Sequence, residues 1–167
     1  LKCMNFNIPF ARIEKEIKKN YSFYWYHYLS VQLEYIKFWQ SQLKDLEILL
    51  IGLQAVIQTV NYVSKNIGTD LNSFVEGKLP KNMDFSEANI SATSISEVTN
   101  IPRATCIRKL EKLVNMDILY KSKNTKRYYL ALDNLNDNPK FNFMLGVKRT
   151  IEIFSQFSSI VLKGLSR

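Results

Sequence analysis

Apolar residues recur at helical spacing along much of the chain, and the most informative stretch runs from residue 94 to residue 132. Within it, Cys106, Leu110 and Leu113 lie at positions i, i+4 and i+7. This spacing predicts a helix over residues 102–116 that buries one face. The opposite side of the same helix carries mostly basic residues, so we expect the helix to present a cationic face.

A shorter helix is predicted immediately before this one. Ser94 and Glu97 have the spacing of a capping box, in which each side chain satisfies a free backbone N–H at the start of a helix. Residues 99–100 would form the turn between the two helices, with Ile101 as an apolar plug. Pro102 suits the first position of the second helix, because its fixed φ fits there and its missing N–H is not needed.

Two segments with the composition of β-strands follow the second helix. Residues 118–121 and 127–132 are rich in aliphatic and aromatic residues, and the polar residues 122–126 would form the tip of a hairpin. The hairpin carries four positive charges, which are Lys121, Lys123, Lys126 and Arg127. We expect it to lie as a wing along a phosphate backbone or in an adjacent minor groove.

Three longer helices are predicted over residues 21–43, 44–66 and 141–165. The first carries two adjoining apolar stripes, which is more than one small domain needs and favours the pairing of two copies. The predicted dimer contacts are Tyr24, Trp25, Tyr28, Val31, Tyr35, Phe154 and Val161. An ordinary core helix, or a ligand pocket built from the aromatic residues between 23 and 28, is the alternative for this surface.

The predicted fold is mainly α with a small β-hairpin wing: a winged helix-turn-helix domain flanked by N- and C-terminal dimerisation helices. Residues 1–43 would form the N-terminal dimerisation region, and residues 1–20 within it a solvated helix or a flexible arm. Residues 44–132 would form the DNA-binding domain, with a long connection over residues 67–90 that is unusual in a compact domain. Residues 133–167 would contain a helix that packs on the N-terminal helix.

Positive charge concentrates in the same stretch of the chain. The 167 residues carry a net charge of +8, and residues 91–130 hold eight lysines and arginines against three acidic residues, a local net charge of +5. This is the electrostatic footprint of a nucleic-acid-binding surface, and arginine can pair with guanine in the major groove. The predicted DNA contacts are Arg103, Ala104 and Arg108 for base edges, Thr105, Lys109 and Lys112 for phosphates, and the four cations of the hairpin.

The run from residue 101 to residue 119 resembles the recognition helix of bacterial winged helix-turn-helix transcription regulators of the broad MarR-like kind. Those proteins show an Arg-x-Thr-aliphatic start, then Arg-x-Leu-x-x-Leu, then a Gly-aliphatic turn into the wing. The matching residues here are Arg103, Thr105, Cys106, Arg108, Leu110 and Leu113. Asp117 stands where the family usually has glycine, and aspartate tolerates the left-handed conformation better than most residues do. The resemblance implies a winged helix that binds DNA.

The sequence shows few features of a metal-binding protein, an enzyme, a secreted protein or a membrane protein. Cys3 and Cys106 are far apart and belong to no metal-binding motif, which suits a reducing cytoplasm. His27 is the single histidine, so neither a zinc site nor the usual acid–base sets of an enzyme are expected, and no cofactor is implied. The sequence shows no secretory signal and no apolar run near the roughly 18 residues of a membrane span.

We therefore expect a cytoplasmic, homodimeric, sequence-specific regulator of transcription that binds double-stranded DNA, with no contact to a membrane. Two recognition helices would enter successive major grooves of a pseudo-palindrome. A small-molecule effector is left open by the sequence. The alternatives are a helical protein-interaction module and a replication or plasmid-maintenance protein that uses the same fold.

Overall fold

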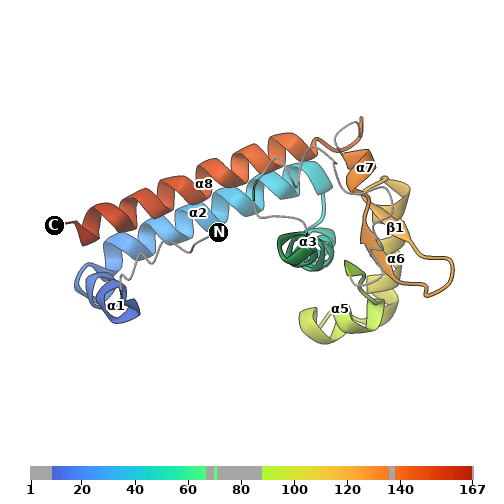
Figure 1. Cartoon of the computed structure of the whole chain (residues 1–167), viewed down its shortest axis with the longest axis horizontal. Coiled ribbons are helices and arrows are strands. Elements are labelled where there is room, and N and C mark those ends of the chain that lie inside the picture. The colour runs from blue at the N-terminus through green and yellow to red at the C-terminus, as the bar shows by residue number, and fades with distance from the viewer. Residues whose placement is uncertain (1–8, 67–69, 71–87, 136–137, 167) are drawn as a thin grey trace. The chain divides into compact units, whose positions relative to one another are not determined.

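The computed structural model describes residues 9–66, 70, 88–135 and 138–166. The chain is mainly helical with a small two-stranded antiparallel hairpin, as predicted (Figure 1). It divides into two compact units, and the first joins residues 1–38 to residues 147–167, while the second comprises residues 39–146. The division by function into residues 1–43, 44–132 and 133–167 that the sequence predicts remains a prediction.

The first unit is built from α1 (Phe10–Lys19) and from the larger parts of α2 (Tyr21–Leu43) and α8 (Phe143–Leu165). Helix α2 has the bounds that the sequence predicted, and α1 is a regular helix where an arm was the alternative. Within this unit α2 and α8 run antiparallel, because early residues of α2 meet late residues of α8 (Figure 1). The rings of Tyr28 and Phe157 lie 5.9 Å apart.

Two glycines of α8 let large side chains of α2 approach its backbone. A Cβ atom on Gly164 would overlap the hydroxyl of Tyr24, and one on Gly146 would overlap the ring of Trp39. Tyr24 is 4% exposed and donates a hydrogen bond of 3.1 Å to Glu16 of α1. Tyr24 is therefore packed inside its own chain and ties α1, α2 and α8 together.

The second unit packs α3 (Leu46–Asn66), α5 (Ala92–Thr99) and α6 (Arg103–Asn115) against the hairpin of β1 (Leu119–Lys121) and β2 (Tyr128–Leu130). Its fully buried large side chains are Ile48, Ile51, Thr59, Ile95, Cys106, Leu110, Leu113, Leu119 and Leu135. The predicted stripe of α6 is thus confirmed as its buried face. Each such aliphatic side chain stabilises the fold by about 1.5–3 kcal/mol relative to an exposed one.

Helix α3 is long and apolar enough to cross a membrane by length and composition alone, although no segment of that kind was expected from the sequence. The core helices of soluble proteins pass the same test. The buried side of α3, with Ile48, Ile51, Ala55 and Val63, packs inside the second unit.

Helix α5 begins three residues earlier than predicted. Ser91 is its N-cap, and the Ser91 hydroxyl accepts a hydrogen bond of 3.0 Å from the backbone N–H of Ser94. The chain becomes extended just before, because Ile90 exchanges two backbone hydrogen bonds of 2.8 and 2.9 Å with Tyr128 of β2. The capping box at Ser94 was wrong because this bridge brings Ser91, which has the same capping chemistry, to the start of the helix.

The turn between α5 and α6 follows the prediction closely. Asn100 ends α5 in the left-handed conformation, with φ of 56°, and Ile101 is buried between the two helices. Pro102 is the N-cap of α6, one position before the predicted place, and leaves Arg103 as the first helical residue.

Helix α6 ends in a compact turn around Asp117. The N–H of Asp117 donates to the carbonyl of Val114 and the N–H of Ile118 to the carbonyl of Leu113, which is the hydrogen-bond pattern of a Schellman motif. Asp117 has φ of 57° and so lies in the left-handed region, as expected for a residue that replaces glycine. This turn passes the chain directly from α6 into β1.

Replacing Asp117 by glycine is expected to stabilise the protein. The left-handed conformation costs a non-glycine residue about 1–2 kcal/mol. Glycine avoids this cost but also raises the conformational entropy of the unfolded chain, which cancels part of the gain. We expect a net gain of about 0.5 kcal/mol, measurable as a rise of a degree or two in the thermal midpoint. Asp117→Ala is the matched control, since it loses the same side chain but should destabilise; a lower midpoint for Asp117→Gly would contradict the assignment.

Candidate nucleic-acid interface

The side of α6 opposite its buried stripe faces solvent. Arg103, Ala104, Arg108 and Lys112 are all exposed, and Thr105 is half-buried. Helical spacing places Ala104, Arg108 and Lys112 on the side away from Cys106, Leu110 and Leu113. Arg103 shares the rotational position of Leu110 and is exposed because it is the first residue of the helix. Four of the six contacts predicted on this helix are therefore exposed to solvent.

Arg103 is held in position by the preceding helix. Its Nε donates a hydrogen bond of 3.1 Å to the hydroxyl of Thr93 in α5. The guanidinium keeps its remaining donors for other partners, because one hydrogen bond uses only one of the five N–H groups of arginine. Thr93 has no local sequence signal that marks this role, since the two residues meet only when α5 packs on α6.

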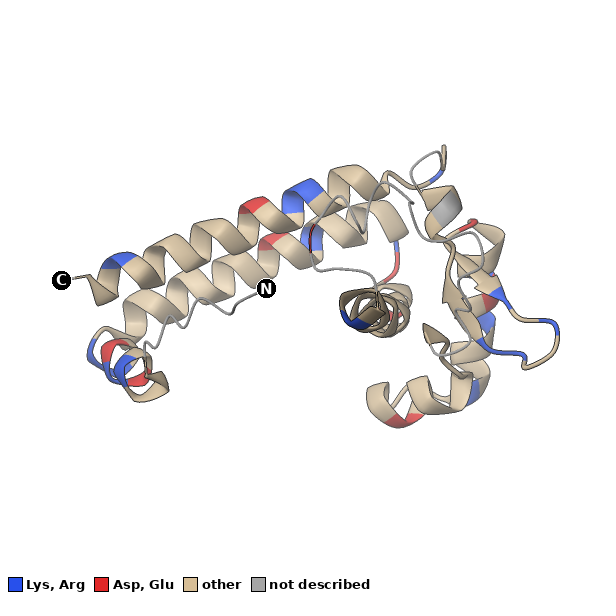
Figure 2. Cartoon of the chain, viewed as in Figure 1, with Lys and Arg blue, Asp and Glu red and all other residues tan. Residues whose placement is uncertain are grey.

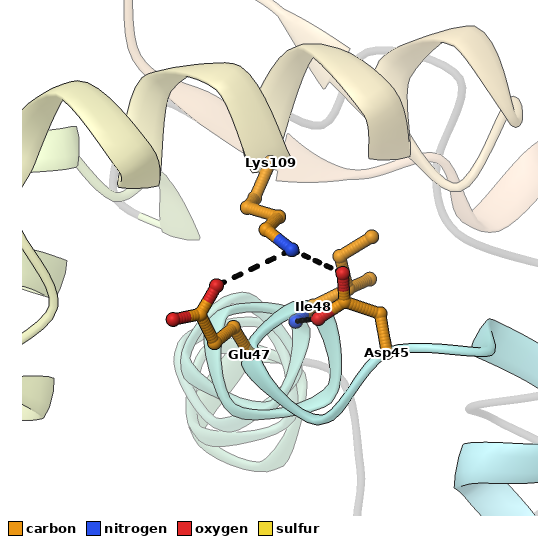
Figure 3. A network of polar contacts seen from close by, with 4 residues as sticks. All are labelled: Asp45, Glu47, Ile48 and Lys109. Carbon is orange, nitrogen blue, oxygen red and sulfur yellow. Dashed lines mark hydrogen bonds and ion pairs between the residues drawn. The ribbon is translucent and has the colours of Figure 1, made fainter.

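Lys109 lies elsewhere than predicted. Its ammonium is bound between Asp45 and Glu47 at the start of α3, and the oxygen of Glu47 is 3.3 Å away (Figure 3). The hydrogen bond with Asp45 raises the pKa of Lys109. Burial pushes the pKa of Asp45 upward, but the hydrogen bonds from Lys109 and from the N–H of Ile48 outweigh it and lower that pKa. The expectation that Lys109 lies on the outer face beside the other cations was wrong, because its ammonium is turned toward α3.

Lys121 is tied within the second unit as well. Its ammonium pairs with Glu111 of α6 and lies 5.4 Å from the centre of the Tyr128 ring, while the Tyr128 hydroxyl donates a hydrogen bond of 2.7 Å to Glu111. The pKa of Glu111 is lowered by its hydrogen bonds from Lys121 and Tyr128, and that of Lys121 is raised by Glu111. Lys121 therefore fixes the hairpin to α6, and its charge is largely compensated, which the sequence reading did not foresee.

The other three cations of the hairpin are exposed near its tip (Figure 2). Lys123 and Lys126 have no ion pair among the described residues, and Arg127 donates a hydrogen bond of 3.0 Å to the side chain of Asn89. The tip is closed by backbone hydrogen bonds between Ser122 and Arg127, of 2.8 Å, and between Lys126 and Ser122, of 3.0 Å. The hairpin is thus a short, regular support for these charges.

We use the name cationic face for the six predicted cations that no ion pair within the described part of the chain compensates. They are Arg103, Arg108 and Lys112 of α6 and Lys123, Lys126 and Arg127 of the hairpin. The nearest carboxylate on α6, that of Glu111, is turned to the hairpin and does not oppose them. An arrangement of this kind can bind a polyanion through several charge-assisted hydrogen bonds.

The residues predicted to pair two copies are not all available. Tyr24 is buried within its own chain, and Val31 and Tyr35 are half-buried. Trp25 and Tyr28 are exposed at 46% and 40%, and their rings stack with centroids 5.6 Å apart. On α8, Phe154 is 70% exposed, while Val161 is half-buried. Tyr24 was wrong as an outward contact, because Gly164 opens a place for its ring against α8.

A cleft of about 560 Å³ lies in the first unit, beside Tyr24. It is lined by Glu16, Lys19, Asn20, Phe23, Tyr24, Ile160, Lys163 and Gly164. Two of the five aromatic residues considered for a ligand pocket border it, while Trp25, Tyr26 and Tyr28 do not. Among the described residues, no group of three His, Cys, Asp or Glu side chains is placed to hold a metal ion.

No protein-family model, no curated protein and no solved structure matches this chain.

The ion pair at the start of α3 should make stability depend on pH. Because the pKa of Asp45 is lower in the folded than in the unfolded protein, its contribution is present above a pH of about 4 and is lost as the pH falls through the folded value. The raised pKa of Lys109 adds a contribution that is present below a pH of about 10.4 and is lost above the folded value.

Asp45→Asn isolates this effect, since asparagine caps a helix about as well as aspartate. We expect the variant to be less stable than the wild type in urea at pH 7, with a difference that shrinks toward pH 3. A difference that stays the same between pH 7 and pH 3 would show that the ionised carboxylate contributes nothing.

Proposed function

We propose that this chain is a sequence-specific regulator of transcription that binds double-stranded DNA as a homodimer. The observation that carries the proposal is the division of α6 into a buried stripe and an outer side that presents Ala104, Arg108 and Lys112, with Arg103 exposed at the first turn. A helix of this kind fits the major groove, where arginine can make a bidentate pair with guanine. No compensating carboxylate from the described residues neutralises these two arginines.

The surrounding elements support the interpretation of this unit as a winged helix-turn-helix. Helices α5 and α6 are joined by a short turn, and the hairpin follows α6 without a further linker. Ile90 adds a third backbone segment beside β2, which anchors the start of α5 to the hairpin. In this proposal α6 is the recognition helix and the hairpin is the wing, whose Lys123, Lys126 and Arg127 would grip phosphates.

The homodimer is proposed from an exposed apolar surface of the first unit, which we name the α2/α8 face. It comprises Trp25, Leu29, Leu33 and Ile36 of α2 and Ile151, Phe154 and Leu162 of α8, exposed at 38–70%. Seen from the N-terminus of either helix, these exposed residues are rotated in the same direction away from the residues that contact the other helix. Because the two helices are antiparallel, both stripes fall on one side of the pair, where helices of a second copy could pack.

The size of the α2/α8 face agrees with a second copy as its occupant. Seven large side chains, each about half exposed, offer on the order of 600 Å² of apolar surface. This is close to the roughly 800 Å² per partner of a standard stable interface. Such a face on a helix pair would bring two recognition helices into one particle, as a two-fold symmetric DNA site requires.

A replication or plasmid-maintenance protein would use the same contacts, and its target site would separate it from a regulator. A helical protein-interaction module is disfavoured by the uncompensated cations of α6 and the hairpin, since such a module has no need of them.

The DNA-binding proposal is tested by selecting ligands from a pool of random duplexes and sequencing the bound fraction. We expect an enriched site with two-fold symmetry, and a loss of about 10- to 100-fold in affinity per arginine in Arg103→Ala with Arg108→Ala. Lys37→Ala with Lys148→Ala is the control, since it removes the same charge from exposed positions of the first unit. Binding without an enriched site would indicate an architectural protein, and no binding at low salt would overturn the proposal.

The homodimer is tested separately by Leu33→Glu and by Phe154→Glu. Burying a carboxylate in an apolar interface is strongly unfavourable, so each variant should be monomeric at micromolar concentration in analytical ultracentrifugation while the wild type is dimeric. Phe10→Glu, which alters an exposed aromatic residue outside the α2/α8 face, should remain dimeric. Dimers of normal stability in both face variants would place the interface elsewhere.

A further inference from the structure

Lys109 belongs to α6, like Arg103, Arg108 and Lys112, but its side chain does not lie on the cationic face. Its side chain is only 13% exposed, and its ammonium spans Asp45 and Glu47 at the first turn of α3 (Figure 3). A lysine placed on a DNA-binding surface to contact phosphate would need a free ammonium. The position of Lys109 therefore calls for a different role.

The partner of Lys109 is itself firmly held. One carboxylate oxygen of Asp45 accepts a hydrogen bond of 3.1 Å from the N–H of Ile48, while the other binds Lys109. The carbonyl of Asp45 accepts a further hydrogen bond of 3.1 Å from the N–H of Leu49. Asp45 follows Lys44, whose φ of 60° fixes the sharp turn between α2 and α3. Two backbone hydrogen bonds and the turn at Lys44 thus hold Asp45 in place, and Asp45 in turn restrains the lysine that it binds.

This anchor adds something that the buried stripe of α6 does not supply. Burial of Cys106, Leu110 and Leu113 decides which side of α6 faces α3. Apolar contacts have no preferred bond direction, so they define the exact rotation of the helix less sharply. A charge-assisted hydrogen bond has a defined length and direction, and therefore it does constrain rotation.

A second polar attachment acts on another side of α6. Glu111 is two residues after Lys109, so by helical spacing the two side chains leave the helix in nearly opposite directions. Glu111 binds Lys121 and Tyr128 of the hairpin. With Lys109 held by α3 and Glu111 held by the hairpin, α6 is fixed from two sides.

We propose that Lys109 is a positioning residue whose ion pairs with Asp45 and Glu47 set the rotation of α6, and thereby the direction in which Arg103 and Arg108 point. This inference rests on the proposed DNA-binding function of that helix. It assigns to Lys109 an effect on the discrimination between DNA sequences and no contact with phosphate.

The test compares Lys109→Gln with Lys112→Gln, which remove the same charge from the same helix three residues apart. Binding of each variant is measured over a range of salt concentrations, on the selected duplex and on a scrambled one. For Lys112→Gln we expect the slope of log affinity against log salt to fall by about 0.9, which is the contribution of one phosphate contact. For Lys109→Gln we expect an unchanged slope and a ratio of specific to non-specific affinity reduced by about tenfold.

Two further variants test whether the ion pairs of Lys109 themselves carry the effect. Lys109→Arg should restore the ratio, because a guanidinium can span the same two carboxylates. Asp45→Asn with Glu47→Gln, which leaves α6 unaltered, should reproduce the effect of Lys109→Gln. A reduced slope for Lys109→Gln, or an unchanged ratio, would overturn the inference.

A measurement without DNA keeps this inference distinct from the proposed function. In hydrogen exchange, Lys109→Gln should speed the exchange of the α6 amides relative to Lys112→Gln, while the buried amides of α3 stay protected. If the wild type binds no duplex, the proposed function fails, yet faster exchange in α6 still supports the anchoring of that helix. Equal exchange in the two variants would overturn the inference whether or not the protein binds DNA.

Discussion

The packing of one stripe of α6 against α3 is the interaction on which the second unit depends. Cys106, Leu110 and Leu113 are buried almost completely, and their burial decides which residues of the helix can meet a ligand. The same contact brings Lys109 within reach of Asp45. A helix that packed through another stripe would expose apolar residues and hide its arginines, so fold and proposed function share one physical requirement.

The positive charges of this unit have two different roles. Lys109 and Lys121 join α6 to its neighbours through carboxylates, which compensates their charge and orients the helix. The six residues of the cationic face have no ion pair within the described part of the chain, and in our proposal they bind an external anion. A count of charges along the sequence treats all eight alike, whereas the attraction for a polyanion depends on those that no internal carboxylate compensates. The electrostatic surface is therefore smaller and more localised than the sequence indicated.

Local patterns in the sequence predicted the longer helices, the turn between α5 and α6, the hairpin and the left-handed Asp117, because each is decided by residues close in the chain. They did not predict the short helix α7 (Leu132–Leu135), which begins where the second strand was expected to end. The features that were missed depend on residues brought together by folding. Lys109 and Asp45 are 64 positions apart, and the start of α5 is decided by a backbone bridge between Ile90 and Tyr128. The prediction that Tyr24 points outward failed for the same reason, since the space for its ring exists only because Gly164 lies beside it on α8.

The compact turn at Asp117 also limits how the length of this chain can vary. The N–H of Ile118 donates a hydrogen bond to the carbonyl of Leu113, so no additional loop residue separates the last turn of α6 from β1. Side chains of a strand alternate between its two faces, and one extra residue at this junction would exchange the buried Leu119 with its neighbour Tyr120. The tip of the hairpin has no such restriction. Insertions and deletions should therefore accumulate at the tip during evolution, while the junction keeps its length.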